Sequence, residues 1–231
     1  MIGEHSPGTM QEFFCAPAMN VVDIGDVDPI QAAAFGLTHL TAWRMLITRA
    51  KLQPGMTVLV TGIGGGVALA LLNIARHFEC AVIVTSRHQW KLDRALAMGA
   101  SSGILDDGSD WSKVVRARTG KRGVDIVADS VGMAVHGQCL KSLVRCGTFV
   151  TCGATTGGDA TTDLSRLFWN QLSLLGSTMG SMSEFRSVLC FLHTGKIKPV
   201  IDSVHLSENA KIAYERLESG EQFGKIVIDW R

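Results

Sequence analysis

The chain has 231 residues, with 22 Lys and Arg against 21 Asp and Glu and a formal net charge of +1. This balance argues against a nucleic-acid-binding protein, which needs a basic surface excess to neutralise phosphates. Hydrophobic residues make up 46% of the chain, which excludes a largely disordered protein and is enough for a sizeable core.

The cysteines and the uncharged stretches indicate the cellular setting. None of the six cysteines forms a Cys-x-x-Cys pair, so the sequence offers no zinc ribbon. Residues 52–75 carry no charge, but a Pro-Gly turn and several glycines interrupt them, which favours a buried strand, turn and helix over a membrane span. With no signal-peptide pattern at residues 1–10, we expect a cytoplasmic protein with free thiols and no membrane contact.

From residue 28 onward, strand and helix patterns alternate. A helix is predicted at 28–51, with Asp28 as the N-cap and Pro29 at the first helical position. Apolar strands separated by helices indicate a parallel sheet buried on both faces, and therefore a doubly wound α/β fold of the Rossmann type. The predicted strands are 57–61, 81–85, 103–105, 124–128, 148–152 and 173–178, and the helices are 67–77, 89–98, 109–118, 134–143, 164–170 and 183–194.

The two ends of the chain differ from this alternating region. The first 27 residues are expected to hold loops with short strands at 11–16 and 21–24. After Pro199, the pattern predicts a strand at 200–206, a helix at 208–219 and a strand at 225–229. We therefore divide the chain into 1–27, a dinucleotide-binding domain at 28–198, and a terminal strand-helix-strand unit at 199–231.

A glycine-rich turn joins the first predicted strand to its helix. In this position, glycines permit a tight turn and let a pyrophosphate approach the backbone, while the helix N-terminus offers free N–H groups. The strict G-x-G-x-x-G spacing fails at Val67, so a merely structural turn is the alternative. The expected contacts are Gly62, Gly64, Gly65, Gly66 and Val67.

The end of the second strand indicates which dinucleotide binds. NAD sites usually carry an acidic residue there, but this chain has Ser86 and Arg87, with Lys91 one turn further. A guanidinium group binds a 2′-phosphate through paired hydrogen bonds. We therefore predict NADP(H); the alternative is a solvated surface arginine.

Several segments together resemble the medium-chain dehydrogenase/reductase superfamily, and in particular its quinone-oxidoreductase-like branch, often labelled zinc-binding alcohol dehydrogenase. The most specific segment is Leu167-Phe168-Trp169 with the following 174–181. The other matching segments are 40–43, 58–68, 91–100, 123–132, 147–150 and 223–227.

The resemblance implies hydride transfer between nicotinamide and a small carbonyl, enal or quinone. It places Thr41 near the nicotinamide end of the cofactor, although a local helix hydrogen bond is the alternative for this hydroxyl. It also places two strand ends on the cofactor side, with Asp129, Ser130, Gly153, Ala154 and Thr155. No catalytic side chain is identified.

The family also has a GroES-like catalytic domain, and most of its residues have no counterpart in this sequence. Residues 1–27 and 199–231 resemble the pieces that complete that domain. The third catalytic zinc ligand of zinc-dependent relatives would fall near Leu37, which cannot bind a metal. We therefore expect no metal site. The resemblance further implies a homodimer through the edge strand 173–178.

Two other functions share some of these sequence features: a short-chain dehydrogenase and a nucleotide-binding module without activity. A short-chain dehydrogenase needs a Tyr-x-x-x-Lys pair, but the only tyrosine, Tyr214, is followed four residues later by Glu218. A nucleotide-binding module without catalytic activity remains the alternative to an enzyme.

Overall fold

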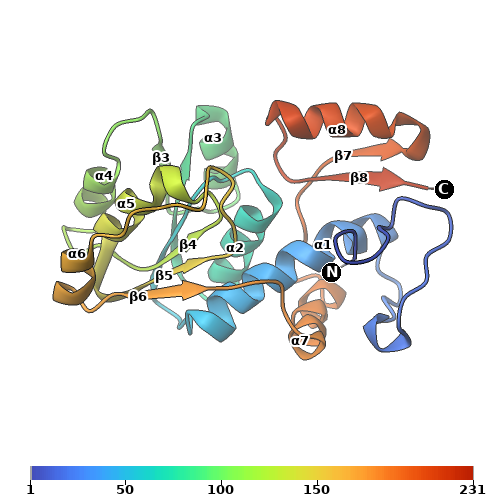
Figure 1. Cartoon of the computed structure of the whole chain (residues 1–231), viewed down its shortest axis with the longest axis horizontal. Helices are drawn as coiled ribbons and strands as arrows, with labels where there is room; N and C mark the ends of the chain where they lie inside the picture. The colour runs from blue at the N-terminus through green and yellow to red at the C-terminus, as the bar shows by residue number, and fades with distance from the viewer. Residues whose placement is uncertain (1, 231) are drawn as a thin grey trace.

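A computed structural model describes residues 2–230 of the chain. Its main sheet has six parallel strands in the order β3-β2-β1-β4-β5-β6, so the order reverses between β1 and β4 (Figure 1). This is the doubly wound fold predicted from the alternating pattern. The strands are β1 (Thr57–Val60), β2 (Ala81–Ser86), β3 (Ser102–Leu105), β4 (Val124–Asp129), β5 (Leu143–Thr151) and β6 (Ser173–Gly176).

Each face of this sheet is covered by its own helices. Val58 and Val60 of β1 pack into one core cluster, whereas Leu59 between them packs into the other. This alternation explains why the strands read as continuous apolar runs. The helices are α1 (Pro29–Trp43), α2 (Gly66–His77), α3 (Gln89–Ala97), α4 (Ser112–Arg118), α5 (Met133–Ser142), α6 (Leu164–Trp169) and α7 (Met182–His193).

The first helix begins where the sequence predicts. Asp28 is the N-cap, and its carboxylate accepts a hydrogen bond from the Ile30 backbone N–H at 3.2 Å. The helix continues past Trp43 as a π-helical segment, η2 (Arg44–Arg49), which completes the predicted span of 28–51.

Some predictions for the N-terminal region are wrong. Neither 11–16 nor 21–24 forms a strand; the regular element there is a short 3₁₀ helix, η1 (Ala18–Asn20). Strands need a neighbour for their backbone hydrogen bonds, and no described strand pairs with these residues. Phe13 is accordingly 87% exposed. The helix predicted at 109–118 also begins later, at Ser112, after the buried Trp111.

The C-terminal unit forms a separate sheet of two parallel strands, β7 (Ile201–Leu206) and β8 (Lys225–Asp229). The connection between them contains η3 (Ser207–Asn209) and α8 (Ala210–Ser219), which lies over one face of the pair (Figure 1). The unit starts just after the predicted boundary at 198/199, although the division into domains stays a prediction. No helix within residues 2–230 is long and apolar enough to cross a membrane.

Asp202 fixes the geometry of this unit. Its side chain is 2% exposed and pairs with Arg216 through two hydrogen bonds of 2.5 and 2.8 Å. It also accepts the Phe223 backbone N–H at 2.9 Å. Hydrogen bonding from Arg216, despite the opposing effect of burial, lowers the pKa of Asp202 from 3.8 to about 2.

We expect Asp202→Asn to lower the free energy of unfolding by about 2 kcal/mol at neutral pH, the equivalent of its pKa shift. A carboxyl with a lowered folded-state pKa stabilises fully above its unfolded value, and loses that stabilisation as the pH falls through the folded value. Denaturant unfolding should therefore show the variant and the wild type converging between pH 4 and about 2. Asp159→Asn, at an exposed position, is the control. A difference that does not depend on pH would contradict this prediction.

Candidate functional site

A cavity of about 460 Å³ opens beyond the carboxyl ends of the central strands. It lies where the strand order reverses between β1 and β4, which is the position where open α/β sheets bind ligands. The segments that follow β1, β2, β3 and β4 contribute to it, and Asp106 is the residue that follows β3. Two segments from later in the chain complete it. Of the predicted site residues, the cavity brings together Gly62, Gly65, Ser86, Arg87, Lys91, Ser130 and Thr155.

The turn after β1 requires glycine at two positions. Gly62 has φ +63°, and a Cβ there would lie 2.9 Å from Val131 Cγ2. Gly64 has φ +120°, and a Cβ would lie 2.7 Å from Lys91 Cδ. The Ile63 N–H donates to the Thr85 carbonyl at 2.8 Å, which ties the turn to the end of β2. The backbone itself therefore forms this wall of the cavity.

Gly65 is the N-cap of α2, and it faces open space. No side chain caps this helix, and a Cβ on Gly65 would meet nothing within 4 Å. The first N–H groups of a helix have no acceptor within the helix, and they carry a partial positive charge. Gly66 and Val67 begin the helix at this point. The turn thus presents free N–H donors to an accessible space, as an anion requires.

The residues after β2 have different roles from one another. Ser86 is buried, and its hydroxyl accepts the His88 N–H at 3.1 Å. Arg87 is exposed, without a hydrogen-bond or salt-bridge partner among the described residues. Lys91 is only 7% exposed and donates to the Gly220 carbonyl at 2.5 Å. Burial lowers the pKa of Lys91. Arg87 is therefore the cation of this group that is free to bind a ligand.

Asp129 connects the ends of three strands and does not line the cavity. It is fully buried and accepts hydrogen bonds from the Thr61 hydroxyl at 2.5 Å and from the Val131 and Gly132 N–H groups at 3.1 and 3.0 Å. The Thr151 hydroxyl lies 3.5 Å away. Its carboxylate therefore holds the backbone that follows β4 in place.

Gly153, Ala154 and Thr41 do not line the main cavity. Gly153 and Ala154 line a neighbouring cavity of about 280 Å³, together with Asp129. Thr155 is held beside Ser130, because its hydroxyl donates to the Ser130 carbonyl at 3.0 Å. The Thr41 hydroxyl donates to the Leu37 carbonyl at 2.8 Å, within α1, and Thr41 lines neither cavity.

The segment between α8 and β8 forms another wall of the cavity. We did not predict from the sequence that this segment contributes to the site. Gly220 and Gln222 line the cavity, and Gln222 Oε1 is buried without a hydrogen-bond partner. The Gly224 N–H donates to the Gly64 carbonyl at 2.9 Å. The Lys225 side chain passes over Gly66, with its Cδ 2.7 Å from where a Cβ would lie.

Lys225 adds a second unpaired cation beside the start of α2. Burial lowers its pKa, and it forms no salt bridge with any described residue. A local motif could not reveal this contact, because Lys225 and the glycine turn are far apart in the chain.

Comparisons with known proteins identify the family and the fold of this chain. The family model for zinc-binding dehydrogenases matches residues 66–194. The chain belongs to the zinc-binding dehydrogenase family. The resemblance drawn from the sequence is thereby confirmed, as is the doubly wound fold.

Individual members of this family match most of the chain. The zinc-type alcohol dehydrogenase-like protein YogA of Leptosphaeria maculans is 33% identical over 87% of this chain and 58% of its own length. Quinone oxidoreductase-like protein 2 of Bos taurus is 28% identical over 86% of this chain and 60% of its own. A crystal structure of an NAD-dependent alcohol dehydrogenase superposes with a TM-score of 0.93 at 37% identity, over 100% of this chain and 68% of that one. The chain thus spans about three fifths of the curated relatives.

The name of the family implies a zinc ion, but the described residues do not fit one. Within residues 2–230, no group of three or more His, Cys, Asp and Glu side chains is arranged to hold a metal. Leu37, at the position expected for a ligand by resemblance, is an aliphatic side chain that is 53% exposed.

Proposed function

We propose that this chain forms the cofactor-binding part of an oxidoreductase that transfers hydride between NADP(H) and a small carbonyl, enal or quinone, independently of zinc. The observation that carries the proposal is the open glycine turn. Backbone N–H groups at the start of α2 face an accessible space beside Gly65. The unpaired cation Arg87 lines the same cavity, and the side chain of a second one, Lys225, passes over Gly66. Membership of a dehydrogenase family supports the type of chemistry.

The residues of the cleft suggest how a dinucleotide would be oriented, with the adenosine end near β2 and the nicotinamide end near the segment after β4. Gly62, Gly65 and the first N–H groups of α2 would hold the pyrophosphate, with Lys225 neutralising part of its charge. Ser86 and Arg87 would face the adenosine ribose and its 2′-phosphate. The nicotinamide half would then extend toward Ser130 and Thr155. Thr41 remains a proposed neighbour of that half, although its hydroxyl is satisfied within α1.

The bound nicotinamide supplies the hydride chemistry, so the chain has to position it and exclude water. Asp129 contributes by fixing the backbone of residues 130–132, as its hydrogen bonds to Val131 and Gly132 require. No side chain of the described cleft is assigned an acid or base role.

The coenzyme preference rests on Arg87. The NAD-dependent alcohol dehydrogenase whose structure is similar at 37% identity shows that membership of the family does not decide between the coenzymes. Arg87 favours NADP(H), because an exposed guanidinium without a protein partner at the end of β2 is free to pair with a phosphate.

We also propose a cytoplasmic location and the division of the chain into three parts. All six cysteines are free, which supports a reducing, cytoplasmic setting. The division into residues 1–27, 28–198 and 199–231 follows the change from the six-stranded sheet to the two-stranded one.

The glycine turn is tested by Gly65→Ala. Its new methyl group would enter the open space over the N–H groups without any clash inside the protein. We expect the Kd for NADPH to rise about tenfold or more, a loss of about 1.4 kcal/mol, with an unchanged thermal midpoint. Calorimetric titration measures the affinity, and Gly137→Ala, at an exposed site on α5, is the control.

An unchanged Kd for Gly65→Ala would contradict the proposed pyrophosphate site. Separately, NADPH that binds but is not oxidised by any of a panel of quinones, enals and small carbonyls would overturn the hydride-transfer proposal, and would leave a binding module.

Coenzyme choice is tested by Arg87→Ala. Loss of charge-assisted hydrogen bonds to the 2′-phosphate should weaken NADPH binding by about ten- to a hundredfold and leave NADH binding unchanged, which lowers the NADPH/NADH affinity ratio. Arg145→Ala, at another exposed arginine, should not alter this ratio. If Arg87→Ala leaves the ratio at its wild-type value, Arg87 does not select the coenzyme.

We also propose a homodimer through β6. Among the described strands, β6 pairs only with β5, which leaves its other edge without a neighbouring strand. Figure 1 shows α6 close to the start of β6. Three apolar side chains of α6 are 62–70% exposed: Leu164, Phe168 and Trp169. A bare edge flanked by apolar surface invites pairing with a second copy.

Sedimentation at micromolar concentration should show a dimer. Phe168→Asp/Trp169→Asp should shift it to the monomer without lowering the thermal midpoint, since both side chains are already exposed. Ile212→Asp/Leu217→Asp, which changes exposed apolar residues of α8, is the matched control. A monomeric wild type would overturn this assembly.

A further inference from the structure

The proposed cofactor cleft, which is the cavity of about 460 Å³ beyond the central strands, contains one acidic residue. Of the 17 described residues that line it, Asp106 is the only Asp or Glu. Like charges repel one another, so a carboxylate in this cleft opposes the binding of phosphate groups. Asp106 is therefore expected to contact a part of the ligand that is not phosphate.

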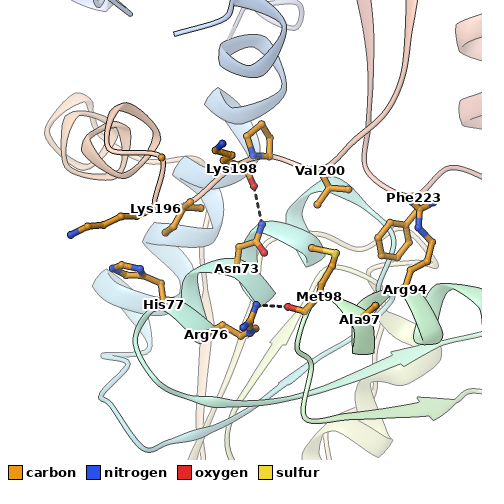
Figure 2. Close-up of a pocket in the computed structure, with 13 residues that line it drawn as sticks. Asn73, Arg76, His77, Arg94, Ala97, Met98, Lys196, Lys198, Val200 and Phe223 are labelled. Atoms are coloured by element: carbon orange, nitrogen blue, oxygen red, sulfur yellow. Dashed lines mark hydrogen bonds between the residues drawn. The ribbon is translucent and has the colours of Figure 1, made fainter. Parts of the chain in front are cut away.

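A second cavity, of about 810 Å³, has the opposite charge pattern. It lies between the C-terminal ends of α2 and α3 and the segment 195–200, and none of its described lining residues is Asp or Glu (Figure 2). Its cations are spread apart: Lys196 extends away from the cavity, and the Arg94 guanidinium lies on the opposite side, 4.4 Å from the centre of the Phe223 ring. They do not converge on one point, so the lone acid of the proposed cofactor cleft is the more specific indication of a ligand.

The backbone fixes the face of the sheet on which Asp106 lies. The Asp106 N–H donates to the Ser86 carbonyl at 2.8 Å, which continues the pairing of β3 with β2. Side chains alternate along an extended strand, so Asp106 lies on the same face as Ile104. Ile104 is 3% exposed and belongs to the same core cluster as Val135 of α5. Asp106 is therefore on the face of the sheet that α5 covers.

The charge of Asp106 also acts on α5. Burial raises the pKa of the Cys139 thiol well above its usual value, and the charges of Asp129 and Asp106 add to this effect. Electrostatic effects of this kind weaken with distance. Cys139 lies one turn after Val135, which lines the cleft. The Asp106 carboxylate therefore lies toward the side of the cleft that α5 forms.

No protein group pairs with this carboxylate. Asp106 is partly buried, and its side chain has no hydrogen-bond or salt-bridge partner within residues 2–230. The nearby Lys91 ammonium donates to the Gly220 carbonyl instead. A partly buried acceptor without a donor favours a ligand that supplies one.

The wall of the cleft on the α5 side is apolar. Val131, Ala134 and Val135 contribute to it. Val131 Cγ2 lies 2.9 Å from where a Cβ on Gly62 would be, so this wall adjoins the glycine turn. An apolar wall with one unpaired acceptor across from it suits a purine, which has apolar faces and polar edges.

A dinucleotide has three kinds of uncharged donor: the nicotinamide carboxamide, the ribose hydroxyls and the adenine amino group. The carboxamide would lie near Ser130 and Thr155, whereas Asp106 follows β3, the strand at the far edge of the sheet. A contact with the ribose beside Arg87 would bring the carboxylate against the 2′-phosphate, which repels it. The donor that remains is the exocyclic amino group of adenine.

We propose that Asp106 recognises the base of the dinucleotide: its carboxylate accepts a hydrogen bond from the amino group of adenine, so the cleft prefers adenine to hypoxanthine. The inference rests on the function proposed above, because a dinucleotide must occupy the cleft.

The test compares NADPH with its hypoxanthine analogue, in which a carbonyl oxygen replaces the amino group, by calorimetric titration of the full chain. The analogue should bind the wild type about tenfold or more weakly, because it lacks the donor and turns an acceptor toward the carboxylate. In Asp106→Asn, the ratio of the two affinities should fall to about one, since an amide offers an acceptor to adenine and a donor to hypoxanthine.

Asp107→Asn is the matched control. It makes the same change of charge one residue further along the chain, at an exposed position that does not line the cleft. This variant should keep the wild-type affinity ratio. Both variants should keep the wild-type thermal midpoint, because the Asp106 side chain has no protein partner and an asparagine at 107 can still accept the Ser109 N–H.

The outcomes separate this inference from the proposed function. If NADPH binds but the analogue binds the wild type equally well, or if Asp106→Asn leaves the affinity ratio unchanged, Asp106 does not read the base. An equal fall of the ratio in Asp107→Asn would assign the effect to net charge alone and remove the contact. NADPH that does not bind at all would overturn the proposed function and this inference together.

Discussion

The proposed cofactor cleft, which is the cavity of about 460 Å³ beyond the central strands, depends on backbone conformations that glycine adopts most readily. At Gly62 and Gly64 the chain turns from β1 into α2 with positive φ, and neighbouring side chains occupy the space that a Cβ would need. Any other residue there would have to move Val131 or Lys91, which are themselves part of the cleft. In the same turn, a Cβ on Gly65 would meet no other atom within 4 Å. One short stretch of chain therefore packs closely against the protein at Gly62 and Gly64 and stays accessible to a ligand at Gly65.

The cleft is also held together by contacts across the sheet. Asp129 binds groups from the ends of β1, β4 and β5, which are adjacent in the sheet but separate in the sequence. Since it is fully buried, its role is to set the position of the backbone that lines the cleft. The site therefore combines a local device, the glycine turn, with a long-range one at Asp129.

The sequence was sufficient to predict the fold because its signals are local. Apolar strands, the cap at Asp28 and the glycines after β1 are each visible within a few residues. The expected strands near Phe13 failed because a strand needs a partner, and the local pattern does not show whether one is present. Lys91 shows the same limit: the local pattern indicated a phosphate contact, which stays a prediction, but it could not reveal that the ammonium group also donates to the Gly220 carbonyl. The contribution of Lys225 depends entirely on tertiary contacts.

Two consecutive residues, Gln222 and Phe223, face different cavities. Gln222 lines the proposed cofactor cleft, and Phe223 lines the cavity of about 810 Å³ at the C-terminal end of α2. One short segment therefore separates the two cavities. A molecule that displaces this segment from one side changes the shape of the space on the other. Thermodynamic linkage makes such an effect reciprocal. If a ligand in one cavity changes the affinity of the other cavity for its ligand by some factor, the second ligand changes the affinity for the first by the same factor.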